Sequence, residues 1–178
     1  LKSKGVLPPH LRFQVSIPMV NSAAPLRVFD DARSCELVRA GYAEALALEL
    51  DKVLEHIPHR ELALQWDCAA ELQLAYQGQV AQQLPQVAIS RNIPEDVALG
   101  FHLCFGTLGG WPRFAPEDLG AAVELANGFF EAAGRRVDWM HIPVLPRSDD
   151  PFFAPLRNLR PGKSKIYLGM IHNMAGFE

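Results

Sequence analysis

GFHLCFG, residues 100–106, combines the apolar pattern of a buried strand with two residue types that commonly bind metals. His102 and Cys104 stand two positions apart, and side chains at i and i+2 of a strand point to the same face of its sheet. An imidazole and a thiolate placed in this way form half of a zinc site, since a catalytic zinc usually takes three protein ligands. The alternative interpretation is a buried cysteine beside a hydrogen-bonded histidine near the end of a strand.

This strand belongs to a series of short apolar stretches that alternate with helical patterns. The predicted strands are Arg12–Pro18, Leu62–Ala69, Leu99–Phe105, Val137–Val144 and Lys165–His172. The predicted helices are Ser34–Glu55, Glu71–Gln83 and Glu117–Ala133. Strands that alternate with helices indicate a parallel sheet, so the sequence predicts an α/β fold.

The ends and inner faces of two of these helices are also predicted. Ser34 is the expected N-cap of the first helix. The residues of this helix expected to face the core are Leu37, Val38, Ala45, Leu48 and Val53. For the helix Glu117–Ala133, Pro116 is expected at the first helical position and Gly134 at the end.

The 178 residues, 49% hydrophobic and 21% charged, have the length and composition of one globular domain. A net charge of -3 excludes the basic surface of a typical nucleic-acid-binding protein, and the apolar runs are too short for a membrane span. Cys35, Cys68 and Cys104 are odd in number and widely spaced, which favours a reducing cytoplasm over a disulfide framework. The expected partner is a small molecule rather than nucleic acid or a membrane.

Residues that can bind metals or transfer protons stand near the carboxyl ends of several predicted strands. They are Asp67, His102, Cys104, His141 and His172. In a (β/α) barrel the carboxyl ends of the strands surround the active site. A single histidine there has the alternative role of a hydrogen bond to a neighbouring loop, but its repetition on successive strands favours a shared site.

Two loops that follow predicted strands add candidate substrate contacts. Arg147 is expected to bind a carboxylate or phosphate, because a planar guanidinium pairs well with both. The alternative is a solvated turn in which Arg147 pairs with Asp149 or Asp150. The glycine-rich loop 106–111 lacks the lysine of a phosphate-binding loop, and we interpret it as a mobile loop with Trp111 as a substrate-binding lid residue.

Four blocks of sequence, in this order and spacing, resemble the catalytic barrel of cobalamin-independent methionine synthase. They are QWDCAAE at 65–71, HLCFG at 102–106, VDWMHIPV at 137–144 and YLGMIH at 167–172. The chain is most similar to the shorter methionine-synthase-II-like proteins of the same superfamily, which also contains uroporphyrinogen decarboxylase. The resemblance covers nearly all of the chain and implies a (β/α)8 TIM barrel.

The resemblance also implies roles for individual residues. His102 and Cys104 match the His-x-Cys pair that supplies two zinc ligands. Asp67 matches the aspartate that holds the amino group of the amino-acid substrate, and His172 matches a histidine that passes a proton to the departing folate. The implied reaction is zinc-dependent methyl transfer from a folate-type donor to a thiol, in which zinc lowers the pKa of the thiol.

The implied zinc site departs from the family pattern at its other ligands. Pro143 stands at the position of the third ligand, a glutamate, and proline cannot bind zinc. The fourth ligand, a cysteine, is expected beyond Glu178. His141, Cys68 and Glu71 are the candidates to replace them in a rearranged site, with His141 also expected to be catalytic and Glu71 to bind substrate.

The resemblance places the predicted strands as the third to seventh of an eight-stranded barrel, so we expect residues 1–178 to form a single, partial TIM-barrel domain. We expect a piece of a longer protein or an incomplete gene product, with a homo-oligomer that covers the open barrel edges. Two alternatives to methyl transfer follow. One is a metal-free enzyme similar to uroporphyrinogen decarboxylase that acts on a carboxylated ligand, and the other is an inactive remnant with a structural or interaction role.

Overall fold

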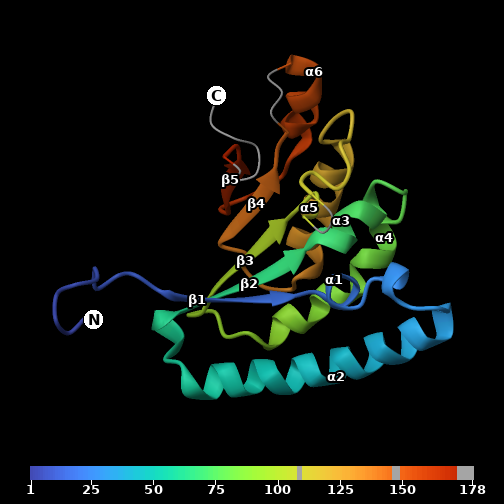
Figure 1. Cartoon of the computed structure of the whole chain (residues 1–178). Helices are drawn as coiled ribbons and strands as arrows, with labels where there is room; N and C mark the ends of the chain where they lie inside the picture. The colour runs from blue at the N-terminus through green and yellow to red at the C-terminus, as the bar shows by residue number, and fades with distance from the viewer. Residues whose placement is uncertain (108–109, 146–148, 172–178) are drawn as a thin grey trace.

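A parallel sheet of five strands organises the chain, in the order β1-β2-β3-β4-β5. A computed structural model describes residues 1–107, 110–145 and 149–171. The elements are β1 Phe13–Pro18, α1 Val20–Ala23, η1 Leu26–Val28, α2 Ala32–His56, η2 His59–Glu61, β2 Leu62–Cys68, α3 Ala69–Ala75, α4 Val80–Gln83, η3 Pro85–Asn92, β3 Ala98–Leu103, α5 Gly120–Ala132, β4 Trp139–Pro143, α6 Asp150–Phe153, η4 Ala154–Asn158 and β5 Lys165–Gly169. Figure 1 shows the strands side by side with α2, α3 and α5 packed beside them.

All of the predicted strands are present, and their parallel pairing confirms the predicted α/β architecture. Their ends lie within three residues of the predicted ends, and those at Pro18, Leu62 and Lys165 coincide with them. The predicted strand over Leu99–Phe105 ends at Leu103, because the carbonyl oxygens of Phe105 and Gly106 both accept from the Arg113 backbone N–H, each at 3.2 Å. Cys104 therefore lies just after β3, at the start of a loop that folds back on the strand end.

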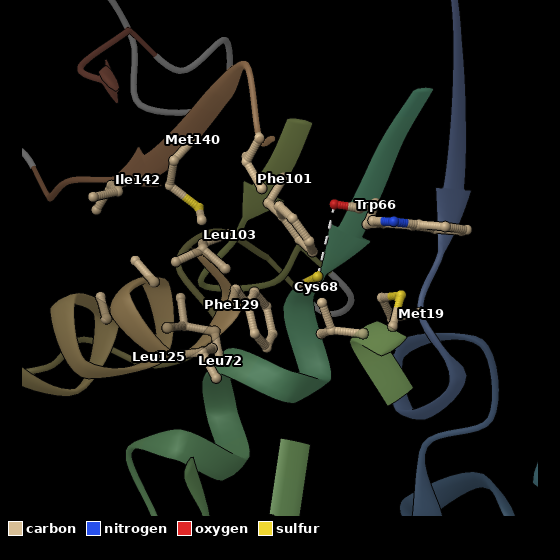
Figure 2. Packing of buried hydrophobic residues seen from close by; sticks show 14 of the residues in the cluster. Met19, Trp66, Cys68, Leu72, Phe101, Leu103, Leu125, Phe129, Met140 and Ile142 are labelled. Carbon is tan, nitrogen blue, oxygen red and sulfur yellow. Dashed lines mark hydrogen bonds between the residues drawn. The ribbon is translucent and has the colours of Figure 1, made fainter. Parts of the chain in front are cut away.

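The covered face of the sheet carries the core. Trp66, Phe101 and Met140, from β2, β3 and β4, are at most 1% exposed. The ring of Phe101 packs 5.0 Å from the ring of Phe129 in α5. Figure 2 shows these side chains packed together with leucines of α3 and α5. Successive strand residues point to opposite faces, so the alternate residues of the same strands form the open face of the sheet.

The long helix α2 begins before its predicted N-cap. Asp31 is the N-cap, and its carboxylate accepts from the Ser34 backbone N–H at 2.9 Å and from Ser34 Oγ at 2.7 Å. Ser34 was the wrong residue for this role. An aspartate three positions earlier is an equally good N-cap and leaves Ser34 inside the first turn, where its N–H is the donor that the cap satisfies.

The predicted inner face of α2 was also largely wrong. The buried residues are Cys35, Leu46 and Leu50, and the exposed residues include Leu37, Val38, Ala45 and Leu48. Val53 alone among the predicted residues packs partly against the core. Apolar residues occur on opposite sides of this helix, so periodicity did not distinguish the side that the sheet covers.

Two other helices are shorter than predicted. The predicted helix Glu71–Gln83 is divided into α3 and α4, with Gly78 between them at a φ of +78°, a conformation that favours glycine. Helix α5 begins at Gly120 rather than near Pro116, because Asp118 forms a turn in which its carboxylate accepts from the Gly120 N–H at 2.7 Å. Its predicted end is confirmed, since Gly134 follows the C-cap with a φ of +64°.

Within the described residues, no helix is both long enough and apolar enough to cross a membrane.

Candidate functional site

A row of polar side chains crosses the open face of the sheet. Strand register pairs Asp67 with His102, His102 with His141, and His141 with Tyr167. Paired residues of neighbouring parallel strands project from the same face, so these side chains form a continuous line near the carboxyl ends of β2 to β5. We call these residues the polar row. The sequence predicted Asp67, His102 and His141 as parts of one site, and the register places them together.

The two histidines of the polar row are in direct contact. Their Nδ1 atoms are 2.9 Å apart, and their rings lie 4.6 Å apart at a tilt of 31°. One Nδ1 must donate and the other must accept, so at least one of the rings carries no proton on Nδ1. A doubly protonated pair is incompatible with this hydrogen bond.

Both histidine pKa values are shifted in the direction that keeps the rings neutral. Burial lowers the pKa of His102, and the charge of Asp67 opposes the shift in part. Burial also lowers the pKa of His141, a charge on His102 lowers it further, and a hydrogen bond with the Leu103 backbone opposes these effects. Near neutral pH, the pair therefore presents neutral imidazole nitrogens, which accept protons or bind metals.

The carboxylate of Asp67 is oriented by a neighbour on the same strand. Gln65 Nε2 donates to Asp67 Oδ1 at 2.9 Å and lies 3.3 Å from Ser16 Oγ on β1. Asp67 itself is half-buried, so one side of the carboxylate is accessible. An acceptor held in this way suits an ammonium group of a ligand.

The thiol of Cys104 lies beyond the polar row at the end of β3. Its Sγ accepts from the Gly106 N–H at 3.2 Å. Burial raises the pKa of Cys104, the Gly106 hydrogen bond lowers it, and the charge of Asp67 raises it. The net direction is upward, so Cys104 is a neutral thiol near pH 7 unless a cation displaces its proton.

The implied zinc site was tested against the donor groups of the structure. Among residues 1–107, 110–145 and 149–171, no three His, Cys, Asp or Glu side chains are placed to hold one metal ion. Cys68 is fully buried on the covered face, where its Sγ lies 3.7 Å from the Trp66 carbonyl oxygen (Figure 2). The described residues thus offer His102 and Cys104 without the third protein ligand that a catalytic zinc requires, and Cys68 is excluded as its replacement.

Glu71 lies outside the polar row, and the structure corrects its expected place in the site. Its side chain is 0% exposed, and its Oε1 accepts from the backbone N–H groups of Asn21 and Ser22 at 2.9 and 3.1 Å. Ser22 Oγ donates to Oε2. Burial raises the pKa of Glu71, and the hydrogen bonds oppose the shift. Glu71 connects α1 to α3 and has no surface for a substrate or a metal.

Two cavities adjoin the polar row. An open hollow of ≈750 Å³ on the open face is lined by His102, His141 and Tyr167 among others. A smaller cavity of ≈260 Å³ is lined by His102, Cys104 and His141 and also by Trp111. We call the smaller one the histidine cavity. Trp111, predicted as a lid residue, lines this cavity together with the predicted metal ligands His102 and Cys104. The other two predicted site residues, His172 and Arg147, lie outside the described residues.

Sequence reasoning missed three residues of the open face. Tyr167 extends the polar row, and Trp139 and Gly169 shape the floor beside it. A Cβ at Gly169 would lie 2.6 Å from His141 Cε1, so glycine leaves the space that this ring occupies. The sequence held one signal that could have identified Tyr167 and Gly169. Side chains alternate between the two faces along β5, which puts both residues on the same face as His141 of β4.

Comparisons of the chain with family models, curated proteins and solved structures found no match.

Proposed function

We propose that this chain forms part of a (β/α)8 barrel similar to cobalamin-independent methionine synthase, and that its polar row binds a small aminothiol as a methyl acceptor. One observation carries the proposal: the register that aligns Asp67, His102 and His141 across neighbouring strands. The consecutive order of parallel strands supports a barrel, because the strands of a (β/α)8 barrel have the same order.

Asp67 takes the role of the ammonium-binding residue. A carboxylate held by Gln65 at 2.9 Å keeps one orientation, and an ammonium that pairs with it directs the rest of a short ligand along the polar row. The ligand sulfur then lies toward the histidines. This arrangement restricts both ends of the substrate, which lowers the entropic cost of reaching the reactive geometry.

His102 takes the role of the proton acceptor. Burial keeps its imidazole neutral, and its Nδ1 contact with His141 leaves the other ring nitrogen for the substrate thiol. The thiol proton moves to His102, and the resulting thiolate attacks the methyl carbon of a folate-type donor. The sulfur–carbon bond forms as the donor nitrogen–carbon bond breaks. The donor nitrogen takes up a proton from water as it leaves, and His102 returns its proton to water, so that one proton is moved in all from sulfur to nitrogen.

The test is calorimetric titration of the purified protein with cysteamine, which carries only the ammonium and the thiol. We expect saturable binding that weakens about tenfold or more in Asp67→Asn, because a charged hydrogen bond is lost. Asp51→Asn, an exposed change on α2, is the matched control and should bind as the wild type does. No saturable binding, or equal weakening in the two variants, would overturn the aminothiol proposal.

Metal content is measured in the same preparations. Zinc that co-purifies in stoichiometric amount, and is lost in both His102→Ala and Cys104→Ser, would show that the pair belongs to a metal site. Zinc-free protein that still binds cysteamine would support proton transfer to His102 without the metal.

A further inference from the structure

The indole of Trp139 lies flat on the open face of the sheet. Strand register pairs Trp139 on β4 with Gly100 on β3. The position of a Cβ at Gly100 is covered by the five-membered ring of this indole, whose Cδ2, Cε2 and Nε1 atoms are the nearest to it. A Cβ projects away from the sheet, so one face of the ring is turned to the Gly100 backbone and the other to the open hollow of ≈750 Å³, which Trp139 lines.

Small residues leave the outer face of this ring accessible. Ala63, Ala98 and Gly169 also line the hollow, and they carry at most a methyl group. Trp139 is half-buried, and Tyr167, which lines the same hollow from the next strand, is 50% exposed. The hollow therefore has an aromatic surface on its floor, with space above it for a ligand.

The two buried or half-buried tryptophans of neighbouring strands differ in their hydrogen bonds. On the covered face, Trp66 Nε1 donates to Ser90 Oγ at 3.0 Å. On the open face, Trp139 Nε1 has no hydrogen-bond acceptor among residues 1–107, 110–145 and 149–171. Trp66 thus has the satisfied indole of a core residue, whereas Trp139 lacks the partner that a tryptophan packed in a core usually has.

Gln65 supplies a hydrogen-bond acceptor to the hollow, which it also lines. Its Nε2 donates to Asp67 Oδ1 at 2.9 Å, and this contact fixes the orientation of the amide, because a carboxylate can only accept. The carbonyl oxygen, Oε1, is on the other side of the amide. In the described part of the chain no group donates to it, so it can accept from a ligand.

The charges around the hollow do not favour an anion. Arg12 is the one arginine or lysine in the described lining. Its Nη1 donates to the backbone carbonyl oxygens of His59, Leu62 and Asp96, at 3.2, 3.0 and 2.8 Å. The carboxylate of Asp67, bound to Gln65, adds negative charge beside the hollow. A ligand here is expected to be neutral or positively charged and to carry N–H donors.

We propose that the open hollow binds a planar aromatic heterocycle that stacks on the outer face of Trp139 and donates a ring N–H or an amino group to Gln65 Oε1. Stacked aromatic rings attract each other beyond the burial of their surface, and a planar ring fits a flat indole without a shaped pocket. Binding of the ring does not rest on the proposed function, because neither Trp139 nor Gln65 Oε1 is used by the aminothiol.

The test is a titration of the ¹⁵N-labelled full chain with adenine, a planar heterocycle with an amino group, followed by the indole N–H signals in NMR spectra. We expect a saturable shift of the Trp139 signal, since a stacked ring changes the magnetic field at the indole. The Trp66 signal is the internal control and should stay in place, because this side chain is 1% exposed. Cyclohexylamine, which has an amino group but no planar ring, should cause no saturable shift.

Two variants test the ring and the acceptor separately, with adenine affinity measured by equilibrium dialysis. Trp139→Leu and Gln65→Leu should each weaken binding about fivefold or more, through loss of stacking and of a hydrogen bond. Phe13→Leu changes an aromatic ring that is 65% exposed and does not line the hollow, and should alter the affinity less than twofold.

The wild-type spectra decide the proposal even if a variant fails to fold. No saturable shift of Trp139, an equal shift of Trp66, or equal binding of cyclohexylamine would overturn the ring site, as would unchanged affinity in Trp139→Leu. Adenine binding without any cysteamine binding would overturn the proposed function alone. Cysteamine binding without any adenine binding would overturn the ring site alone.

Discussion

The covered and open faces of the sheet use alternate residues of the same strands for opposite purposes. On β2 and β3 the covered face presents Trp66 and Phe101, at 1% and 0% exposure. The open face presents Asp67 and His102, which are half-buried and polar. One residue of displacement along a strand therefore separates a side chain that stabilises the core from one that faces a cavity.

The two faces differ in polarity as well as in burial, so burial alone does not identify the role of a residue in this fold. Both sides of a parallel sheet are usually apolar, because helices or a barrel interior cover them. Here the open face has hydrogen-bonded polar groups, such as the contact between His102 and His141 and that between Gln65 and Asp67. Polar groups that replace packing on one face are expected where a ligand binds.

The largest expected effect is on the covered face. Phe101→Ala removes a ring that is 0% exposed and packs 5.0 Å from Phe129, and should lower the free energy of unfolding by about 3–5 kcal/mol. Chemical denaturation followed by circular dichroism measures it. Gln65→Ala on the open face of β2 is the counterpart and should cost about 1 kcal/mol or less. Equal losses of unfolding free energy in Phe101→Ala and Gln65→Ala would contradict the proposed difference between the covered and open faces.

A smaller effect is expected where a glycine lies beneath a large side chain of the open face. Gly100 is paired with Trp139, whose indole occupies the space of a Cβ at position 100. Gly100→Ala must move this ring and should destabilise the protein by about 1–3 kcal/mol. Gly41→Ala in α2 meets no atom within 4 Å and should instead stabilise by about 0.5–1 kcal/mol. Thermal unfolding of both variants checks the sign of each change.

We expect stability to depend on pH through the histidine pair, His102 and His141. The change in the free energy of unfolding should be smaller than that expected for Phe101→Ala. Because burial lowers the pKa of His102 and His141 in the folded protein, the unfolded chain binds protons first as the pH falls below about 6.5. The pair therefore destabilises the fold as the pH falls from about 6.5 through their lowered pKa values. The free energy of unfolding should decline less over this range in His102→Gln/His141→Gln, and an equal decline would contradict the shifts.

The smallest effect is expected on the outer side of α2. Leu48 is 64% exposed, so Leu48→Ala should change the free energy of unfolding by no more than about 0.5 kcal/mol. Leu46, two residues earlier and 4% exposed, is the matched control, and Leu46→Ala should cost about 2–5 kcal/mol. Similar losses of unfolding free energy in Leu48→Ala and Leu46→Ala would support the inner face of α2 that the sequence predicted.

The strands and three members of the polar row, Asp67, His102 and His141, were predictable because both depend on short-range pattern. Apolar stretches such as that around His102 have the length of strands, and strand ends gather in a parallel sheet. The orientation of α2 was not predictable, since Leu37 and Leu46 are equally apolar and only the position of the sheet separates them.

The consecutive order of the strands has a consequence for how the chain acquires its fold. Each described strand pairs only with the strands immediately before and after it in the chain, so none has to be inserted between two that are already joined. The connection that contains α2 is the longest between paired strands, and the entropic cost of closing a loop rises only slowly with its length. The sheet can therefore grow in the direction of synthesis, one strand at a time, without the loss of any pair formed earlier.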